Sequence, residues 1–373
     1  MTETETLQLL TPAGERIAPN PAVAHPATPE QIAAYAAELT LSDLRAAYRN
    51  MVRTRAFDRE ATSLQRQGEL GLWVPSLGQE AAQVGSALAI PAADMIYPSY
   101  REHGVAEVRG LDLREIIPVF RGTRHGGWDP KAHNFHLYTF VIGAHTLHAV
   151  GHAMGLQQDR RRGIVDTADA VVVYFGDGAT SQGDANEALV FASSAEAPVL
   201  FFLQNNHWAI SVPSERQSRF PLANRADGFG IPHLRVDGND VVACYAATRY
   251  ALDHIAAGHG PFYIEAETYR MGAHTTSDDP TRYRTREEEA HWLARDPIAR
   301  LRALLEADGV EPEFFAGVEA EGRELGASVR AFTRANTAGD FTEVFDHVYA
   351  SPNAQVERER AAWDAYLSRG ESR

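Results

Sequence analysis

The sequence predicts an α/β fold: a doubly wound parallel sheet with helices on both faces, an extended N-terminal arm and a helical C-terminal region. Two continuous apolar runs carry this prediction, Ala-Val-Val-Val-Tyr-Phe at 170–175 and Val-Leu-Phe-Phe-Leu at 199–203. Such runs are typical of strands that are buried on both faces. A helical segment at 184–195 connects them, and a strand–helix–strand unit of this kind requires parallel strands and a right-handed crossover.

The first helix of the predicted domain begins with a capping signal. Thr40 and Asp43 form the pattern of a capping box, and Leu44 and Tyr48 begin an apolar stripe at helical spacing. Glycine residues from Gly68 onward end this stripe. The pattern predicts one long helix that packs its apolar face against the rest of the domain.

Shorter elements follow before the first long strand. An alanine-rich segment predicts a helix over 79–89, and Asp-Met-Ile-Tyr-Pro at 94–98 predicts a short buried strand. Residues 121–145 are rich in glycine, histidine and aromatic residues and show no clear period. We expect a functional loop there, because binding residues are commonly carried on loops.

The alternation of strand and helix continues toward the C-terminus. The patterns predict a strand at 234–238, a helix at 241–257 and a strand at 262–266. From residue 286 onward the chain is charged and helical, with breaks near Pro297, Gly309 and Pro312. We therefore expect three parts: an N-terminal arm (1–39), one large α/β domain (40–350) and a C-terminal helical tail (351–373).

Composition excludes several classes of protein. The 373 residues carry 35 basic and 50 acidic side chains, a net charge of −15, which disfavours nucleic acid and anionic membranes as partners. The single cysteine, Cys244, excludes a disulfide framework or a cysteine-based metal site, and no apolar run reaches the roughly 18 residues of a membrane span. The first thirty residues resemble neither a signal peptide nor an Arg-rich transit peptide, so we expect a cytoplasmic protein.

Polar residues follow the two long apolar runs. Gly176-Asp177-Gly178 ends the first run, and Asn205-Asn206 comes just after the second. Parallel neighbouring strands end at the same edge of a sheet, so both motifs should face one crevice. A carboxylate beside a bound phosphate requires a divalent cation between them, and Asp177 and Asn206 offer the oxygen ligands that Mg²⁺ prefers. The structural alternative is an Asp helix cap and an Asn pair in a tight turn.

These motifs resemble the thiamine diphosphate signature of transketolase-like and decarboxylating enzymes. More closely, the chain is similar to the α subunit of the thiamine-dependent first component of 2-oxo acid dehydrogenase complexes. The likeness covers about residues 40–350. The segments that carry it are PSLGQEAAQVGSAL (75–88), YREHG (100–104), GDGATSQGDANEAL (176–189), QNNHWAIS (204–211), RVDGND (235–240) and TYRMGAHTTSDDPTRYRTREE (268–288).

The resemblance implies a thiamine diphosphate-binding fold and a set of site residues. It implies that Mg²⁺ is held by Asp177, Asn206 and the backbone carbonyl of Trp208. It implies that the cofactor is bound by Tyr100, Arg101, Ile142, Gly176, Asp177, Gly178, Ala179, Asn206 and His274. Within that set, Gly178 and Ala179 would offer backbone N–H groups to the diphosphate, and Ile142 would wedge the cofactor into its bent shape. His274 corresponds to the active-site histidine, the one side chain expected to be catalytic.

The resemblance also implies partners. The family takes the glutamate that activates the aminopyrimidine from a β subunit, and neither Glu80 nor Glu102 matches that role. We therefore expect an α2β2 heterotetramer that works with a lipoyl-bearing acyltransferase and is inactive as α alone. The chain departs from animal relatives at Gln204, where the branched-chain enzymes carry arginine, and at Thr275, where kinases modify serine. The loop at 272–285 is expected to be mobile without cofactor.

The preferred hypothesis is oxidative decarboxylation of a branched-chain 2-oxo acid, with transfer of the acyl group to lipoamide. Pyruvate is the alternative substrate, because a pocket discriminates weakly between acids that differ by one or two methylene groups. A nucleotide-binding oxidoreductase is less consistent with the glycine spacing at 176–183, and a noncatalytic interaction subunit is the third alternative.

Five histidines lie between residues 133 and 152 and have no assigned role. His145, His148 and His152 fall on one face of a predicted helix, where polar packing or an interface is favoured over a metal site. His133 and His136 lie in the preceding loop, either beside the substrate entrance or simply at the surface.

Overall fold

The protein is described by a computed structural model that covers residues 6–124, 126–164, 169–336 and 341–370. Its central sheet has five parallel strands in the order β1-β2-β3-β7-β6. The strands are β1 (Met95–Tyr97), β2 (Val171–Gly176), β3 (Val199–Asn205), β6 (His233–Asp237) and β7 (Phe262–Glu267). The predicted doubly wound parallel sheet is confirmed.

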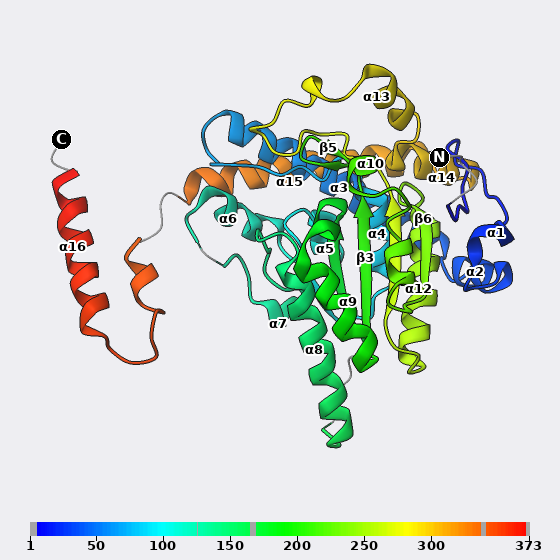
Figure 1. Cartoon of the computed structure of the whole chain (residues 1–373). Helices are drawn as coiled ribbons and strands as arrows, with labels where there is room; N and C mark the ends of the chain where they lie inside the picture. The colour runs from blue at the N-terminus through cyan, green and yellow to red at the C-terminus, as the bar shows by residue number, and fades with distance from the viewer. Residues whose placement is uncertain (1–5, 125, 165–168, 337–340, 371–373) are drawn as a thin grey trace.

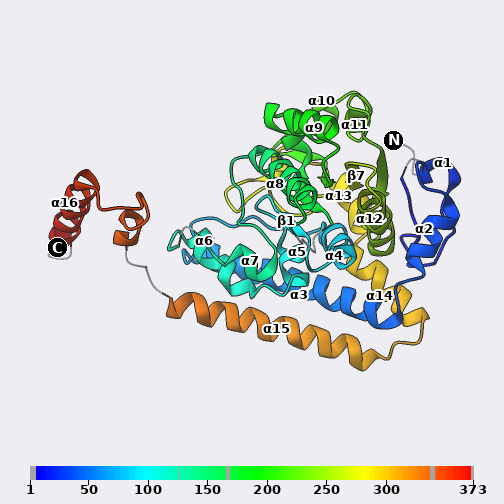
Figure 2. The same cartoon turned by 90° about the horizontal axis from the view of Figure 1, so that it is seen from below.

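Helices cover both faces of the sheet (Figures 1 and 2). On one face, α8 (Ala144–Arg161) and α9 (Gly183–Ala195) pack on Val171, Val173 and Phe201. On the other, α4 (Glu80–Ala89) and α12 (Val241–Ala256) belong to the core that contains Val172 and Phe202. Alternate side chains of each strand therefore enter two separate apolar layers, which explains why the strand sequences are continuously hydrophobic.

The long first helix, α3 (Leu41–Arg66), begins at the predicted capping box. Thr40 accepts from the Asp43 backbone N–H, and Asp43 in turn accepts from the Thr40 backbone. The helix α15 (Pro312–Ala335) runs alongside α3 on the outside of the domain (Figure 2). Gly322 of α15 allows this close approach, because a Cβ there would lie 3.2 Å from Ala56 Cβ.

The N-terminal arm lies against the edge of the sheet. Leu7 pairs with β6 through hydrogen bonds to Arg235 and Asp237, and helix α1 (Pro21–Ala24) precedes α2 (Pro29–Ala36), which packs on α12. The arm therefore adds buried apolar side chains to the main core, among them Leu7, Leu9, Leu10 and Ile32.

The remaining elements are short or C-terminal. They are α5 (His103–Val108), η2 (Leu113–Ile116), α6 (Ile117–Arg121), α7 (Pro130–His133), η3 (Asp177–Ser181), β4 (Trp208–Ala209), β5 (Val212–Pro213), α10 (Ser214–Gln217), α11 (Asn224–Asp227), η4 (Pro280–Arg282), α13 (Arg286–Leu293), α14 (Pro297–Ala307), η5 (Phe341–Phe345) and α16 (Ala354–Gly370). Figures 1 and 2 show η5 and α16 apart from the body of the molecule. None of the helices in the described ranges is both long and apolar enough to cross a bilayer.

Candidate functional site

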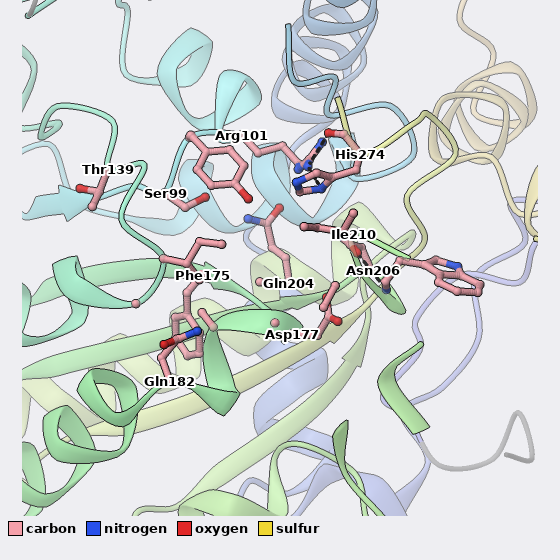
Figure 3. A pocket seen from close by; sticks show the side chains of 18 of the residues that line it. Ser99, Arg101, Thr139, Phe175, Asp177, Gln182, Gln204, Asn206, Ile210 and His274 are labelled. Atoms are coloured by element: carbon pink, nitrogen blue, oxygen red, sulfur yellow. Dashed lines mark hydrogen bonds between the residues drawn. The ribbon is translucent and has the colours of Figure 1, made fainter. Parts of the chain in front are cut away.

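A cavity of about 200 Å³ opens where β2 and β3 end. Gly176 at the end of β2 lies in register with Gln204 of β3, so the two polar motifs meet at one edge of the sheet. All ten residues expected at the site line this cavity: Tyr100, Arg101, Ile142, Gly176, Asp177, Gly178, Ala179, Asn206, Trp208 and His274. Figure 3 shows Arg101 paired with His274 at one end, Asp177 and Asn206 at the other, and Gln204 between them.

Asp177 begins the η3 turn directly after β2. Its carboxylate is almost completely buried, and burial raises its pKa above the usual range. Gln217 of α10 donates from Nε2 to Asp177 Oδ2 over 2.9 Å. A buried carboxylate of this kind gains most from a nearby cation, because the low dielectric strengthens the attraction.

Asn206 and Trp208 follow β3 in a tight turn. The backbone N–H of Trp208 donates to Asn206 Oδ1 over 3.2 Å, and Asn206 Nδ2 donates to Gln79 Oε1 over 2.8 Å. The Trp208 carbonyl accepts from Arg270 over 2.9 Å. A carbonyl oxygen has two lone pairs, so Arg270 leaves one available to a cation.

Arg101 and His274 form the second half of the site. Arg101 is 5% exposed; it donates to the Pro75 carbonyl, to His274 Nδ1 over 3.2 Å and to the His274 carbonyl over 3.0 Å. Arg270 approaches the same Nδ1 at 3.4 Å. Because guanidinium groups only donate, Nδ1 must be the acceptor and the ring proton must lie on Nε2. Burial and the two arginines lower the pKa of His274 to about 3, so its ring is neutral.

The loop that carries His274 is tied down by its own side chains. The His274 backbone N–H donates to Asp278 over 2.8 Å, and Tyr283 donates to the same carboxylate and accepts from Arg270. Arg284 donates to the carbonyls of Arg270 and Gly272. These contacts describe one ordered conformation, and the mobility of 272–285 without cofactor stays a prediction.

Glycine and aromatic residues shape the walls. A Cβ on Gly178 would lie 3.0 Å from Ala209 Cβ, so a side chain larger than hydrogen would crowd the floor at the predicted anion contact. Tyr100 stacks on Phe140 with ring centroids 5.8 Å apart. Ile142 is 41% exposed and precedes Gly143, whose φ of +89° turns the chain into α8. These features fit a ligand that lies between the two ends of the cavity.

Gln204 and Glu102 make a buried network that the motifs alone did not reveal. Gln204 Nε2 donates to Glu102 over 2.7 Å, and Gln83 donates to Gln204 Oε1 over 3.0 Å. Ser99 and the Arg101 backbone also donate to Glu102, whose pKa is raised by burial. The glutamine therefore satisfies Glu102 as a neutral donor.

Other lining residues and positioning contacts were not predicted. The additional lining residues are Gln79, Ser99, Glu102, Thr139, Gly143, His145, Phe175, Gln182, Gln204, Ala209 and Ile210. Arg270 and Gln217 do not line the cavity, but each contacts a residue that does. Arg270 approaches His274, and Gln217 donates to Asp177. Arg270 lies four residues before His274 within the resemblance segment, which was the only sequence signal for it.

The five unassigned histidines are placed as follows. His145 is buried in the first turn of α8, lines the cavity and donates from Nε2 to the Tyr174 carbonyl over 2.7 Å. His136 stacks on Tyr97, and the Tyr97 hydroxyl lies 3.2 Å from His152 Nδ1. His148 is exposed, and His133 lies at the end of α7. Among the described residues, no cluster of three histidine, cysteine or acidic side chains could hold a metal ion.

The residues present fit a magnesium diphosphate. Asp177, Asn206 and the Trp208 carbonyl are hard oxygen donors on one side of the cavity. Arg101 can bind an anion from the other end, and the backbone at Gly178 can bind it beside Asp177. The acidic chain concentrates positive charge here through Arg101 and Arg270, as an anionic ligand requires.

Known proteins are similar to this chain over most of its length. The family described as dehydrogenase E1 component matches residues 48–325. The 3-methyl-2-oxobutanoate dehydrogenase subunit alpha of Mycobacterium tuberculosis strain H37Rv is 44% identical over 337 residues, which cover 89% of this chain and 90% of that protein. The pyruvate dehydrogenase E1 component alpha subunits of Staphylococcus epidermidis and Staphylococcus aureus are 41% identical over 275 residues, or 73% of each chain. The chain therefore belongs to the dehydrogenase E1 component family and is an oxidoreductase.

Proposed function

We propose that this chain is the α subunit of a 2-oxo acid dehydrogenase that binds thiamine diphosphate with Mg²⁺ and acts on a branched-chain 2-oxo acid. The observation that carries the proposal is the meeting of Asp177, Asn206, Arg101 and His274 in one cavity at the ends of β2 and β3. The similarity to a 3-methyl-2-oxobutanoate dehydrogenase along most of both chains favours a branched-chain substrate.

Each residue has a proposed task. Asp177, Asn206 and the Trp208 carbonyl hold the cation, and Arg101 with the backbone N–H groups of Gly178 and Ala179 binds the diphosphate. Tyr100 closes the wall beside Arg101, Gly176 leaves room at the strand end, and Ile142 supports the bent shape of the cofactor. The bound cofactor supplies the carbanion chemistry of decarboxylation, and the protein supplies position and electrostatics.

His274 is the proposed catalytic side chain. Arg101 and Arg270 hold Nδ1, so Nε2–H is the group left to face a ligand. A neutral N–H donor stabilises negative charge that develops near the substrate carboxylate or the lipoyl sulfur, and it does so without competing for the proton. This task requires that the ring stay neutral at physiological pH, which its depressed pKa ensures.

A β subunit is the proposed partner in an α2β2 assembly, and a lipoyl-bearing acyltransferase is the proposed acceptor. Two segments beside the cavity expose large apolar side chains: Phe140, Val141 and Ile142 on one, and Ile210 and Val212 on the other. Exposed apolar patches of this kind mark protein interfaces. A partner seated there would exclude water from the cavity and bring the glutamate that the α chain does not supply.

Pyruvate is the second candidate substrate, because two pyruvate dehydrogenase α subunits match three quarters of this chain. The test is to co-express the chain with its β subunit and to compare turnover of 3-methyl-2-oxobutanoate with turnover of pyruvate. We expect a higher kcat/KM for the branched acid than for pyruvate, and no turnover of either acid by the α chain alone.

Asp177→Ala should abolish Mg²⁺-dependent binding of thiamine diphosphate while circular dichroism shows that the protein stays folded. Normal binding by this variant would overturn the metal assignment.

A further inference from the structure

Gln79 is a buried residue of the cavity wall to which no motif assigns a role. It lies directly before α4, is 0% exposed and lines the cavity beside Asn206. Its backbone is fixed by two hydrogen bonds: its N–H donates to the Ser76 carbonyl over 2.9 Å, and its carbonyl accepts from Gln83. The side chain therefore starts from a rigid point in the chain.

The orientation of the Gln79 amide follows from its neighbours. The Trp208 backbone N–H can only donate, so the atom of Asn206 that faces it must be Oδ1. Asn206 Nδ2 must then face Gln79, and Gln79 must present Oε1 to it, over 2.8 Å. These constraints leave Gln79 Nε2 as the free end of the amide, and none of the described residues places an acceptor within hydrogen-bond distance of that atom.

An unpartnered amide donor of this kind is costly in a protein interior. Among the described residues that line the cavity, Trp208 Nε1 and His145 Nδ1 are also buried without a partner. Gln83, one turn along α4, is fully used: it donates to the Arg101 carbonyl and to Gln204, and it accepts from the Gly104 backbone N–H. Gln79 Nε2 therefore differs from the neighbouring amide of Gln83 on the same wall, and it belongs to the residue that holds Asn206.

We propose that Gln79 is a binding residue of the magnesium diphosphate site. Its Nε2 donates a hydrogen bond to an anionic phosphate oxygen, and its Oε1 holds Asn206 so that the second lone pair of Oδ1 faces the cation. The inference rests on the proposed function, because it names the same ligand. An anionic oxygen is the fitting acceptor, since a metal-bound water donates its own protons and would meet Nε2 with the wrong polarity.

Two variants test the role of Gln79. Gln79→Glu keeps an acceptor for Asn206 Nδ2 but loses the donor and adds negative charge beside the phosphate. Gln79→Met has similar length and loses both polar groups. Each is made in the full-length chain co-purified with its β subunit. Gln157→Met on α8 is the matched control, because that amide binds the carbonyls of Ala195 and Glu196 on the side of α9 away from the site.

The measurement is calorimetric titration with three probes: Mg²⁺ with thiamine diphosphate, Mg²⁺ with inorganic pyrophosphate, and thiamine without phosphate. We expect both Gln79 variants to weaken the two diphosphate probes by about 10- to 100-fold, the size of a lost hydrogen bond to a charged group. Thiamine binding should change less than threefold, and Gln157→Met should leave all three probes unchanged. Melting curves without ligand check that each variant is folded.

The outcomes are distinguishable. If the unmodified protein binds neither diphosphate probe, the proposed function itself is wrong. If it binds both, and both folded Gln79 variants bind them within twofold of the unmodified protein, Gln79 is only a wall residue and this inference is wrong. If one Gln79 variant does not fold, the binding measured with the other variant decides whether Gln79 is a binding residue. Equal loss of thiamine and of pyrophosphate would also overturn the inference, because it would show general distortion of the cavity.

Discussion

At the residue scale, the site depends on side chains that act on their neighbours rather than on the ligand. His274 illustrates this, because its tautomer and its neutrality are set by Arg101 and Arg270. Asp58 likewise positions a residue of the site, Arg101, without contacting the cavity. It is buried and accepts from Trp73 Nε1 and from the backbone and hydroxyl of Ser76, and so fixes the segment whose Pro75 carbonyl holds Arg101.

The pKa of His274 makes a pH-dependent prediction. The folded protein holds this group at a pKa of about 3, below the usual 6.5 that it would have in the unfolded chain. Between these values the unfolded chain binds the extra proton, so the contribution of His274 to stability falls as pH drops from 7 toward 3. His274→Gln should therefore lose less stability than the unmodified protein between pH 7.5 and pH 5 in urea titrations. His25→Gln, at an exposed position, serves as the control; equal losses in the unmodified protein and His274→Gln would contradict the prediction.

At the scale of elements, the close contact of α4 and α12 determines the position of α4 against the sheet. Gly85 of α4 makes this contact possible, since a Cβ there would lie 2.5 Å from the Val241 carbonyl and 2.9 Å from Cys244 Cβ. Gln79 directly precedes the same helix and Gln83 lies on it, so the distance of α4 from α12 decides where both amides lie.

Alanine at two helical glycines should give opposite results. Gly85→Ala should destabilise the protein by about 1–3 kcal/mol, because overpacking against α12 outweighs the better helix propensity of alanine. Gly155→Ala on α8 should stabilise it by about 0.5–1 kcal/mol, because no atom lies within 4 Å of the added Cβ. Chemical denaturation of both variants measures the change in the free energy of unfolding, which should have opposite signs. A stabilising Gly85→Ala would show that α4 and α12 can separate at little cost.

At the scale of the whole molecule, the two ends of the chain differ in how they join the body. The N-terminal segment is part of the core: Asp240 accepts from the backbone N–H groups of Leu9 and Leu10, and Arg300 donates to the carbonyls of Leu10 and Thr11. The C-terminal elements η5 and α16 pack mainly on each other, with Arg360 bonded to Asp346, and lie apart from the body (Figure 1).

Truncations should reflect this difference. Ending the chain at Asn336 should move the thermal midpoint of the body by less than about 2 °C, because little apolar surface of the body becomes exposed. Deleting residues 1–12 should lower the midpoint by far more. The deletion removes the buried Leu7, Leu9 and Leu10, and it takes from the Asp240–Arg300 pair the backbone partners that the arm supplies. Differential scanning calorimetry of the two proteins tests the contrast. A large loss from the C-terminal truncation would show that α16 supports the body.

Much of the sheet was predictable because its signals are local. The runs that became β2 and β3 are continuously apolar, each ends in a polar motif, and parallel pairing brings Gly176 beside Gln204 without further information. The capping box at Thr40 marked the start of α3 for the same reason. The ribbon of β4 and β5 was not predicted, because strands of two residues are too short to show a period.

The sequence by itself determined the parallel sheet and the polar ends of its neighbouring strands, since each depends on residues close together in the chain. The resemblance to a known family supplied ten of the residues that line the cavity. Only the tertiary structure decided how these groups are used. Asn206 meets Gln79 across 127 positions, and Arg101 meets His274 across 173. Local pattern cannot encode such pairs, because hydrogen-bond orientation and the pKa of a buried ring depend on which distant groups packing places around them.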